Sequence, residues 1–208
     1  MPIPLGEDNL TWTLLKTMNS KKCETDTSDL ELRMQINSKL NLALSVMQEC
    51  FEPSIEALTG KDLVGKVIFS RRSKLTRLNY KGFYTVILEK NEEVVSVATV
   101  RIYGDKAAEV PLVATRFHFG WMRMCRVLMN ALEQELKELG VERMTLPAVP
   151  GVLNTWINAF GFRRMNLKDC NLLTTIFWIS KIQYCARNSF SRILQQNQQA
   201  NSCIVQGK

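Results

Sequence analysis

The feature that most constrains the fold is a change of hydrophobic period halfway along the chain. Residues 83–88, 94–103 and 107–116 have the composition of strands and are separated by two short turns, so they predict an antiparallel meander. From residue 124 to residue 139 apolar residues recur at helical spacing, and Gly140 is placed to end that helix. The order of strand, short loop and helix N-terminus is one in which backbone N–H groups can bind phosphates.

Weaker patterns extend this order in both directions. The segment Leu10–Leu15 is expected to form a small strand or helix, and helical spacing predicts a helix over 38–51 and a shorter one within 54–70. After the long helix we expect a strand over 141–146 ended by Pro147, a helix over 152–160, and last strands at Phe162 and over 172–179. Pro111 has no N–H to donate, so the third strand of the meander should bulge or part from a neighbour there.

The 208 residues divide into three parts. Residues 1–32 form an N-terminal segment that is partly flexible, 33–182 form the folded domain, and 183–208 form a tail rich in Gln and Asn that we expect to be disordered. Hydrophobic residues make up 46% of the chain, which is enough for a core. No apolar run approaches the ~20 residues of a membrane span, so no membrane partner is expected.

Cysteine, histidine and charge content exclude several kinds of chemistry. The six cysteines are scattered without a CxxC pair, which favours reduced thiols of an intracellular protein over a zinc module. The single histidine, His118, has no recognisable partner for a Ser-His-Asp or Cys-His mechanism. The net charge is +7, and much of the basic excess lies between Lys61 and Lys81. This stretch is either an anion-binding surface or a solvated face of the protein. No recognition-helix pattern accompanies it, so we do not expect sequence-specific DNA binding.

Four blocks of sequence carry a family resemblance. They are YTVILE at 84–89, SVATVRIYG at 96–104, AEVPLVATRF at 108–117 and GVERMTLPAVPGVLNTW at 140–156. These blocks resemble the acetyltransferase domain of plant PHD-finger proteins of the Increased DNA Methylation type. The resemblance implies that 33–182 is an acetyltransferase-like domain with the GNAT fold, an α/β (α+β) fold with a mixed, mostly antiparallel central sheet flanked by helices. The Cys/His spacing of a PHD finger itself is absent from this sequence.

The resemblance also implies a function. Members of the family are nuclear histone acetyltransferases that use acetyl-CoA and act in chromatin and transcription regulation. We therefore expect a nuclear protein whose partners are a histone tail, or another protein lysine substrate, and chromatin-associated proteins. A small-molecule N-acyltransferase is a further activity that the fold permits.

Individual residues receive roles from the same resemblance. Pantetheine is expected to pair with a strand edge, and the pyrophosphate is expected to lie on the loop and on the start of the following helix. The residues expected to bind the cofactor are Val113, Ala114, Thr115, Gly120, Arg123, Met124, Cys125, Arg126 and Asn154. Asn154 resembles an asparagine that GNAT proteins often point toward the cofactor; the alternative is an ordinary residue near a helix N-terminus.

Glu109 is the candidate general base. In the histone-acetylating branch of the family a glutamate on the strand before the loop has this role, and Glu109 lies fourteen residues before Arg123, as in that branch. The alternatives are a surface glutamate or a structural partner of an arginine such as Arg101. No general acid is assigned, because Trp156, the nearest aromatic residue in the helix that often supplies a tyrosine, has no acidic proton.

The chain departs from the family in the phosphate-binding loop. The family reads Arg-Arg-Gln-Gly-Met-Cys-Arg, whereas residues 120–126 read GWMRMCR, with Arg123 in place of the glycine. A Cβ at this position hinders the close approach of a pyrophosphate, but a guanidinium also attracts phosphate. Two hypotheses follow: an N-acetyltransferase acting on histone lysines, or a catalytically impaired GNAT-fold chromatin-associated binding protein.

Overall fold

The computed structural model describes residues 2–6, 9–17, 27–53, 55, 60, 62–74, 79–119, 121–165 and 183–188. The chain divides into two compact units, which we treat separately. The first contains the described residues up to Arg101 and those from Val110 to Leu132, and the second contains Ile102–Glu109 and the described residues from Glu133 onward. No helix in the described part of the chain is long and apolar enough to cross a membrane.

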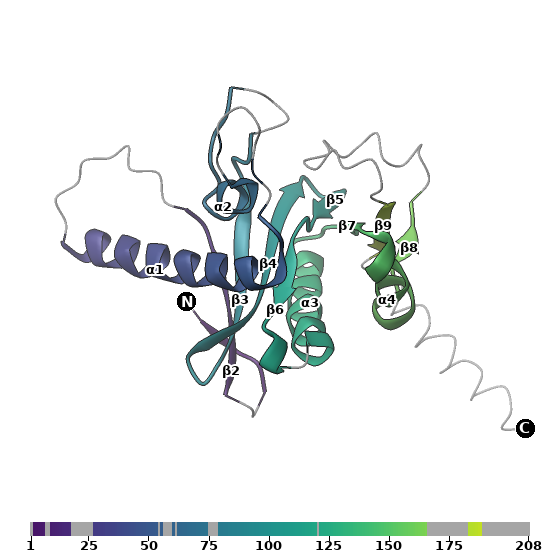
Figure 1. Cartoon of the computed structure of the whole chain (residues 1–208), viewed down its shortest axis with the longest axis horizontal. Coiled ribbons are helices and arrows are strands. Elements are labelled where there is room, and N and C mark those ends of the chain that lie inside the picture. Colours follow the sequence, from purple (N-terminus) through teal and green to yellow (C-terminus); the bar gives the residue numbers. More distant parts are fainter. Residues whose placement is uncertain are drawn as a thin grey trace, which may run out of the picture. The chain divides into compact units, whose positions relative to one another are not determined.

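An antiparallel sheet forms the centre of the first unit (Figure 1). Its strands are β1 (Ile3–Pro4), β2 (Leu10–Leu15), β3 (Tyr84–Lys90), β4 (Glu93–Tyr103) and β6 (Val113–Thr115). Each strand pairs with the next in this order, and a bulge interrupts the β3–β4 ladder after Leu88. The segment Leu10–Leu15, for which the sequence left strand and helix open, is therefore a strand.

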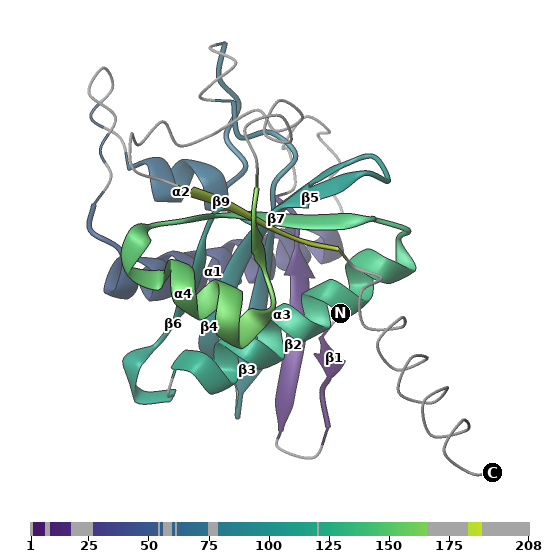
Figure 2. The ribbon, with the colours of Figure 1, turned by 90° about the vertical axis from the view of Figure 1, so that its right-hand side faces the viewer.

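Helices cover both faces of this sheet. In Figures 1 and 2, α1 (Thr27–Cys50) lies on one face, and the first residues of α3 (Trp121–Glu138) lie on the other. The core combines α1, the short helix α2 (Leu63–Ile68) and the sheet; its members include Leu40, Ala43, Met47, Val67, Phe83, Ile87 and Val97. Asp62 caps α2 by accepting hydrogen bonds from the backbone N–H groups of Val64 and Gly65.

The helix predicted over 38–51 is longer than expected, because α1 begins at Thr27. Its buried residues all lie in the C-terminal half, from Leu40 to Met47, whereas Leu30, Leu32 and Met34 are exposed. The periodic pattern used for the prediction reports burial, so it identified only the half of the helix that packs on the core.

Pro111 divides the predicted third strand, as expected. Residues Ala107–Glu109 form β5, which pairs in parallel with β7 (Arg143–Ala148), whereas β6 pairs antiparallel with β4. The expected meander is therefore right for β3, β4 and β6, and β5 also neighbours β4 in the sheet; the parallel pairing of β5 with β7 was not expected. A parallel pair joins segments that are far apart in the sequence, and local periodicity carries no signal for it.

The second unit contains a mixed sheet of β5, β7, β9 (Gln183–Asn188) and β8 (Arg163–Arg164). Pro147 was expected to end β7, but the strand continues to Ala148. In the described part of the chain β5 pairs with β7 only as far as Thr145, so at Pro147 the strand has one partner, β9. On its other side no strand needs a hydrogen bond from residue 147, and the missing N–H of proline is tolerated. Residues 183–188 form a strand where disorder was expected to begin, because their backbone pairs with β7. The strand expected over 172–179 and residues 189–208 lie outside the described residues.

Helix α4 (Pro150–Phe160) completes the second unit. It starts with proline at its first position and ends at Gly161, whose φ of 72° is left-handed. The Trp156 ring packs against Phe160 and Phe162, with ring centroids 4.7 Å and 5.6 Å apart. Gly140, with φ of 75°, follows α3 as predicted.

Candidate active site

The backbone of β6 is the element expected to pair with a cofactor. Its ladder with β4 is fixed by hydrogen bonds from Thr99 N–H to the Leu112 carbonyl (2.9 Å) and from Arg116 N–H to the Val95 carbonyl (3.0 Å), with Ala114 opposite Val97 between them. Polar groups alternate in direction along an antiparallel strand. Ala114 therefore faces β4, whereas the residues on either side of it in β6, Val113 and Thr115, turn their N–H and C=O groups away from β4.

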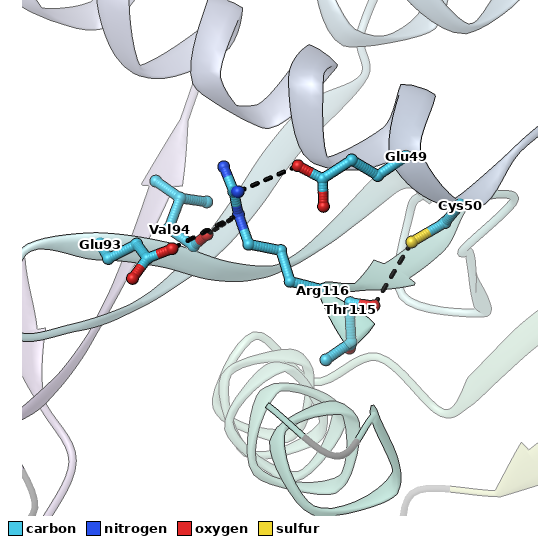
Figure 3. A network of polar contacts seen from close by, with 6 residues as sticks. All are labelled: Glu49, Cys50, Glu93, Val94, Thr115 and Arg116. Carbon is cyan, nitrogen blue, oxygen red and sulfur yellow. Dashed lines mark hydrogen bonds and ion pairs between the residues drawn. The ribbon is translucent and has the colours of Figure 1, made fainter. Parts of the chain in front are cut away.

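Arg116, the residue after β6, fixes the end of this strand (Figure 3). Its Nε donates to the Val94 carbonyl at 2.9 Å, and its guanidinium forms an ion pair with Glu49 of α1 at 2.9 Å. The carboxylate of Glu93 lies 3.8 Å from the same Nε. One side chain thus connects the end of β6 to the beginning of β4 and to the last turn of α1.

A second contact joins α1 to β6. Cys50, the last residue of α1, donates from Sγ to the Thr115 carbonyl at 3.3 Å (Figure 3). Burial raises the pKa of the Cys50 thiol, and this outweighs the lowering effect of that bond, so the residue remains a thiol at neutral pH. The position of the β6 edge is therefore set by α1 as well as by β4.

The helix that follows β6 begins earlier than expected. Gly120 lies outside the described residues, and α3 starts at Trp121 instead of Met124. Arg123 is consequently in the first turn of the helix, where the backbone N–H groups point beyond the N-terminus. Its φ is not positive, so the replacement of the family glycine introduces no left-handed strain, and its side chain is exposed.

The next three residues differ in what they expose. Met124 and Cys125 are buried, and their N–H groups lie past the first turn, within the hydrogen bonding of the helix, whereas the Arg126 side chain is exposed. Burial raises the pKa of the Cys125 thiol to about 12, against a smaller lowering effect of Arg126. Cys125 is therefore protonated at neutral pH and does not serve as a thiolate nucleophile.

Glu109, in the second unit, is the candidate base, and it is a buried residue. The residue is only 1% exposed, and its Oε2 accepts a hydrogen bond of 3.0 Å from the Tyr103 hydroxyl. The surface-glutamate alternative is therefore wrong. Sequence reasoning did not identify Tyr103; the available signal was its position six residues before Glu109, across the turn at 104–106.

The other candidate residues lie as follows. Asn154 is exposed on α4, four residues after the proline that starts the helix. Trp156 is buried in the aromatic cluster, and His118 is exposed in the short 3-10 helix η2 (Phe117–Phe119). Among the residues that the structure describes, no group of three or more His, Cys, Asp or Glu side chains is arranged to hold a metal ion.

Solved structures with a similar backbone are acetyltransferases. An acetyltransferase of the GNAT family from Desulfovibrio desulfuricans superposes with a TM-score of 0.55 at 9% identity, covering 86% of this chain and 99% of that protein. Tetrahymena GCN5 superposes with a TM-score of 0.51 at 15% identity, covering 84% of this chain and 94% of that protein. At these identities the similarity establishes the fold alone.

Sequence comparison identifies the family. Increased DNA methylation 1 of Arabidopsis thaliana is 37% identical over 169 residues, which are 81% of this chain and 14% of that protein's length. The family model for the C-terminal domain of Increased DNA methylation 1 matches residues 51–185, more than half of the chain. The chain therefore belongs to the family of the Increased DNA methylation 1 C-terminal domain and has the fold of the GNAT N-acetyltransferases.

Proposed function

We propose that this chain is an acetyl-CoA-dependent N-acetyltransferase that acts on histone lysines in the nucleus, as part of chromatin and transcription regulation. The fold of acetyltransferases and the relationship to a protein named for DNA methylation support this proposal. The observation that carries it is Glu109, a buried strand carboxylate held by a tyrosine hydroxyl.

Glu109 serves as the general base of the proposed reaction. A lysine ammonium has a pKa of about 10.4 in water, so it must lose a proton before its nitrogen can attack a thioester. Glu109 accepts this proton on a carboxylate oxygen.

The residues around β6 and α3 fit a nucleotide cofactor. When bound, acetyl-CoA supplies an activated acetyl group. The outward N–H and C=O groups of Val113 and the outward N–H group of Thr115 pair with pantetheine, with Ala114 between them; the Thr115 carbonyl accepts from Cys50. The start of α3 holds the pyrophosphate through the backbone N–H groups of its first turn, at 121–123, and the exposed side chains of Arg123 and Arg126.

The alternative function is a catalytically impaired GNAT-fold binding protein in chromatin. The observation that favours it is Arg123, because a side chain in the first turn of the helix lies where the family has a glycine. The two functions differ in whether the Cβ at 123 excludes the pyrophosphate or the guanidinium binds it.

Thermal stabilisation by acetyl-CoA separates these possibilities. Binding raises stability by RT ln(1 + [L]/Kd), so a shift of the melting temperature reports affinity. The native protein should be stabilised, and both Arg123→Ala and Arg123→Gly should bind more weakly because both lose the guanidinium. If the native protein and Arg123→Ala are not stabilised at millimolar cofactor whereas Arg123→Gly is, the Cβ excludes the cofactor and the binding-protein alternative is correct. Arg164→Gly, an exposed arginine on β8, controls for loss of charge.

A further inference from the structure

The geometry around Glu109 assigns a role to a residue that the family resemblance did not indicate. We propose that Tyr103 is the positioning residue of the general base: its hydroxyl holds the Glu109 carboxylate in the orientation from which it accepts the proton of the acceptor amine. This inference rests on the proposed function and adds to it a residue on which the rate of transfer depends.

The backbone of Glu109 is fixed by neighbouring strands. Ala108 and Glu109 pair with Met144 and Thr145 of β7, and the Thr145 hydroxyl donates to the Ala108 carbonyl at 3.1 Å. The turn before β5 is also anchored, because Glu142 N–H donates to the Asp105 carbonyl at 2.8 Å. The main chain therefore holds the Cα of Glu109 in place, and contacts of the side chain determine where its carboxylate lies.

The Tyr103 hydroxyl supplies an anchor at the far end of that side chain. It donates to Oε2 at 3.0 Å, a normal length for this bond. Both residues belong to the second unit, and Tyr103 lies six positions before Glu109, so the contact is local in sequence. A phenol donates without carrying charge, so it orients the carboxylate without neutralising it as an arginine would.

The chemical step assigns different tasks to the two residues. The N–H bond of the acceptor ammonium breaks, its electron pair stays on nitrogen, and the proton goes to a carboxylate oxygen of Glu109. Tyr103 keeps its own proton throughout. Removal of the hydroxyl leaves a base of the same chemical type in a less defined orientation, so the rate should fall without complete loss of activity.

Tyr103→Phe tests the inference, because it removes only the hydroxyl. We expect kcat for transfer to a histone-tail peptide to fall by about tenfold to a hundredfold, the factor that corresponds to a hydrogen bond to a charged group, with an unchanged KM for acetyl-CoA. Tyr84→Phe is the matched control, since Tyr84 is a partly buried strand tyrosine whose ring lies under the Lys16 ammonium. Its activity should equal that of the native protein.

A double-mutant cycle shows whether Tyr103 acts through Glu109. If it does, Tyr103→Phe should cost nothing further in a Glu109→Gln background. The inference would be overturned if Tyr103→Phe had the native kcat, or if it lowered kcat by the same factor in the native protein and in Glu109→Gln. Either result would leave the proposed function intact. If the native protein transfers no acetyl group, the proposed function fails. In that case the unfolding free energies of the same four proteins are measured. If the effects of the two substitutions on stability are not additive, Tyr103 and Glu109 have a structural role as a pair, and the positioning role is overturned.

Discussion

Arg116→Ala is expected to destabilise the protein by about 2–3 kcal/mol, and most of this loss should come from a single hydrogen bond. The bond from Nε to the Val94 carbonyl measures 2.9 Å and is partly buried, and a charged donor of this kind contributes about 1.5–3 kcal/mol. The ion pair with Glu49 has side chains that are 22% and 38% exposed, so solvent screening limits it to about 0.2–1 kcal/mol. The contact with Glu93, at 3.8 Å and with a glutamate that is 53% exposed, adds little.

Urea unfolding of three variants tests this ranking. Glu49→Ala removes only the ion pair and should cost about 0.5 kcal/mol, whereas Arg116→Ala removes both contacts. Arg116→Lys retains the charge but has no donor at the position of Nε, so it should resemble the alanine variant more than the native protein. If Glu49→Ala costs as much as Arg116→Ala, or if the lysine variant is as stable as the native protein, the backbone hydrogen bond is not the main contribution and the reasoning is wrong.

Three further predictions concern stability. Met47→Ala, at a fully buried position in the core, should cost about 2–5 kcal/mol in urea unfolding, and a cost below that range would mean that the core collapses around the cavity. Asp62→Ala should cost about 0.5–2 kcal/mol, because two N–H groups of α2 lose their cap; Asp62→Asn, which keeps an oxygen acceptor, should recover most of it. Cys125 should make the native protein less stable in alkali: its pKa is raised to about 12 when folded, so between its unfolded value of 9.0 and about 12 the unfolded chain binds fewer protons than the native state. Its contribution should therefore fall by about 1.4 kcal/mol from pH 8 to pH 10, measured as the difference between native protein and Cys125→Ala, and equal pH profiles of the two would contradict the raised pKa.

The order of elements was predictable because each one carries a local signal. The stripe of apolar residues predicted α3, Gly140 predicted its end, and Pro111 predicted the division of the third strand. Each of these signals comes from the apolar pattern or the backbone restrictions of a few neighbouring residues, so it can be read from a single sequence.

The features that were missed depend on partners that are distant in sequence or on side-chain directions. The parallel pairing of β5 with β7 and the pairing of β9 with β7 involve segments without a shared local pattern. The start of α3 was placed at Met124, because the first residues of a helix need not join its apolar stripe. The family resemblance indicated Glu109 but not Tyr103, since the contact depends on the direction of a side chain at the end of β4.

The most direct test of the central claim is acetyl transfer from acetyl-CoA to histone-tail peptides, followed by the mass of the product. We predict that the native protein adds an acetyl group to a lysine, and that Glu109→Gln slows this transfer by about a hundredfold or more with an unchanged thermal shift on acetyl-CoA binding. Native protein that binds acetyl-CoA but transfers nothing, or Glu109→Gln that transfers at the native rate, would contradict the assignment of Glu109 as the catalytic base.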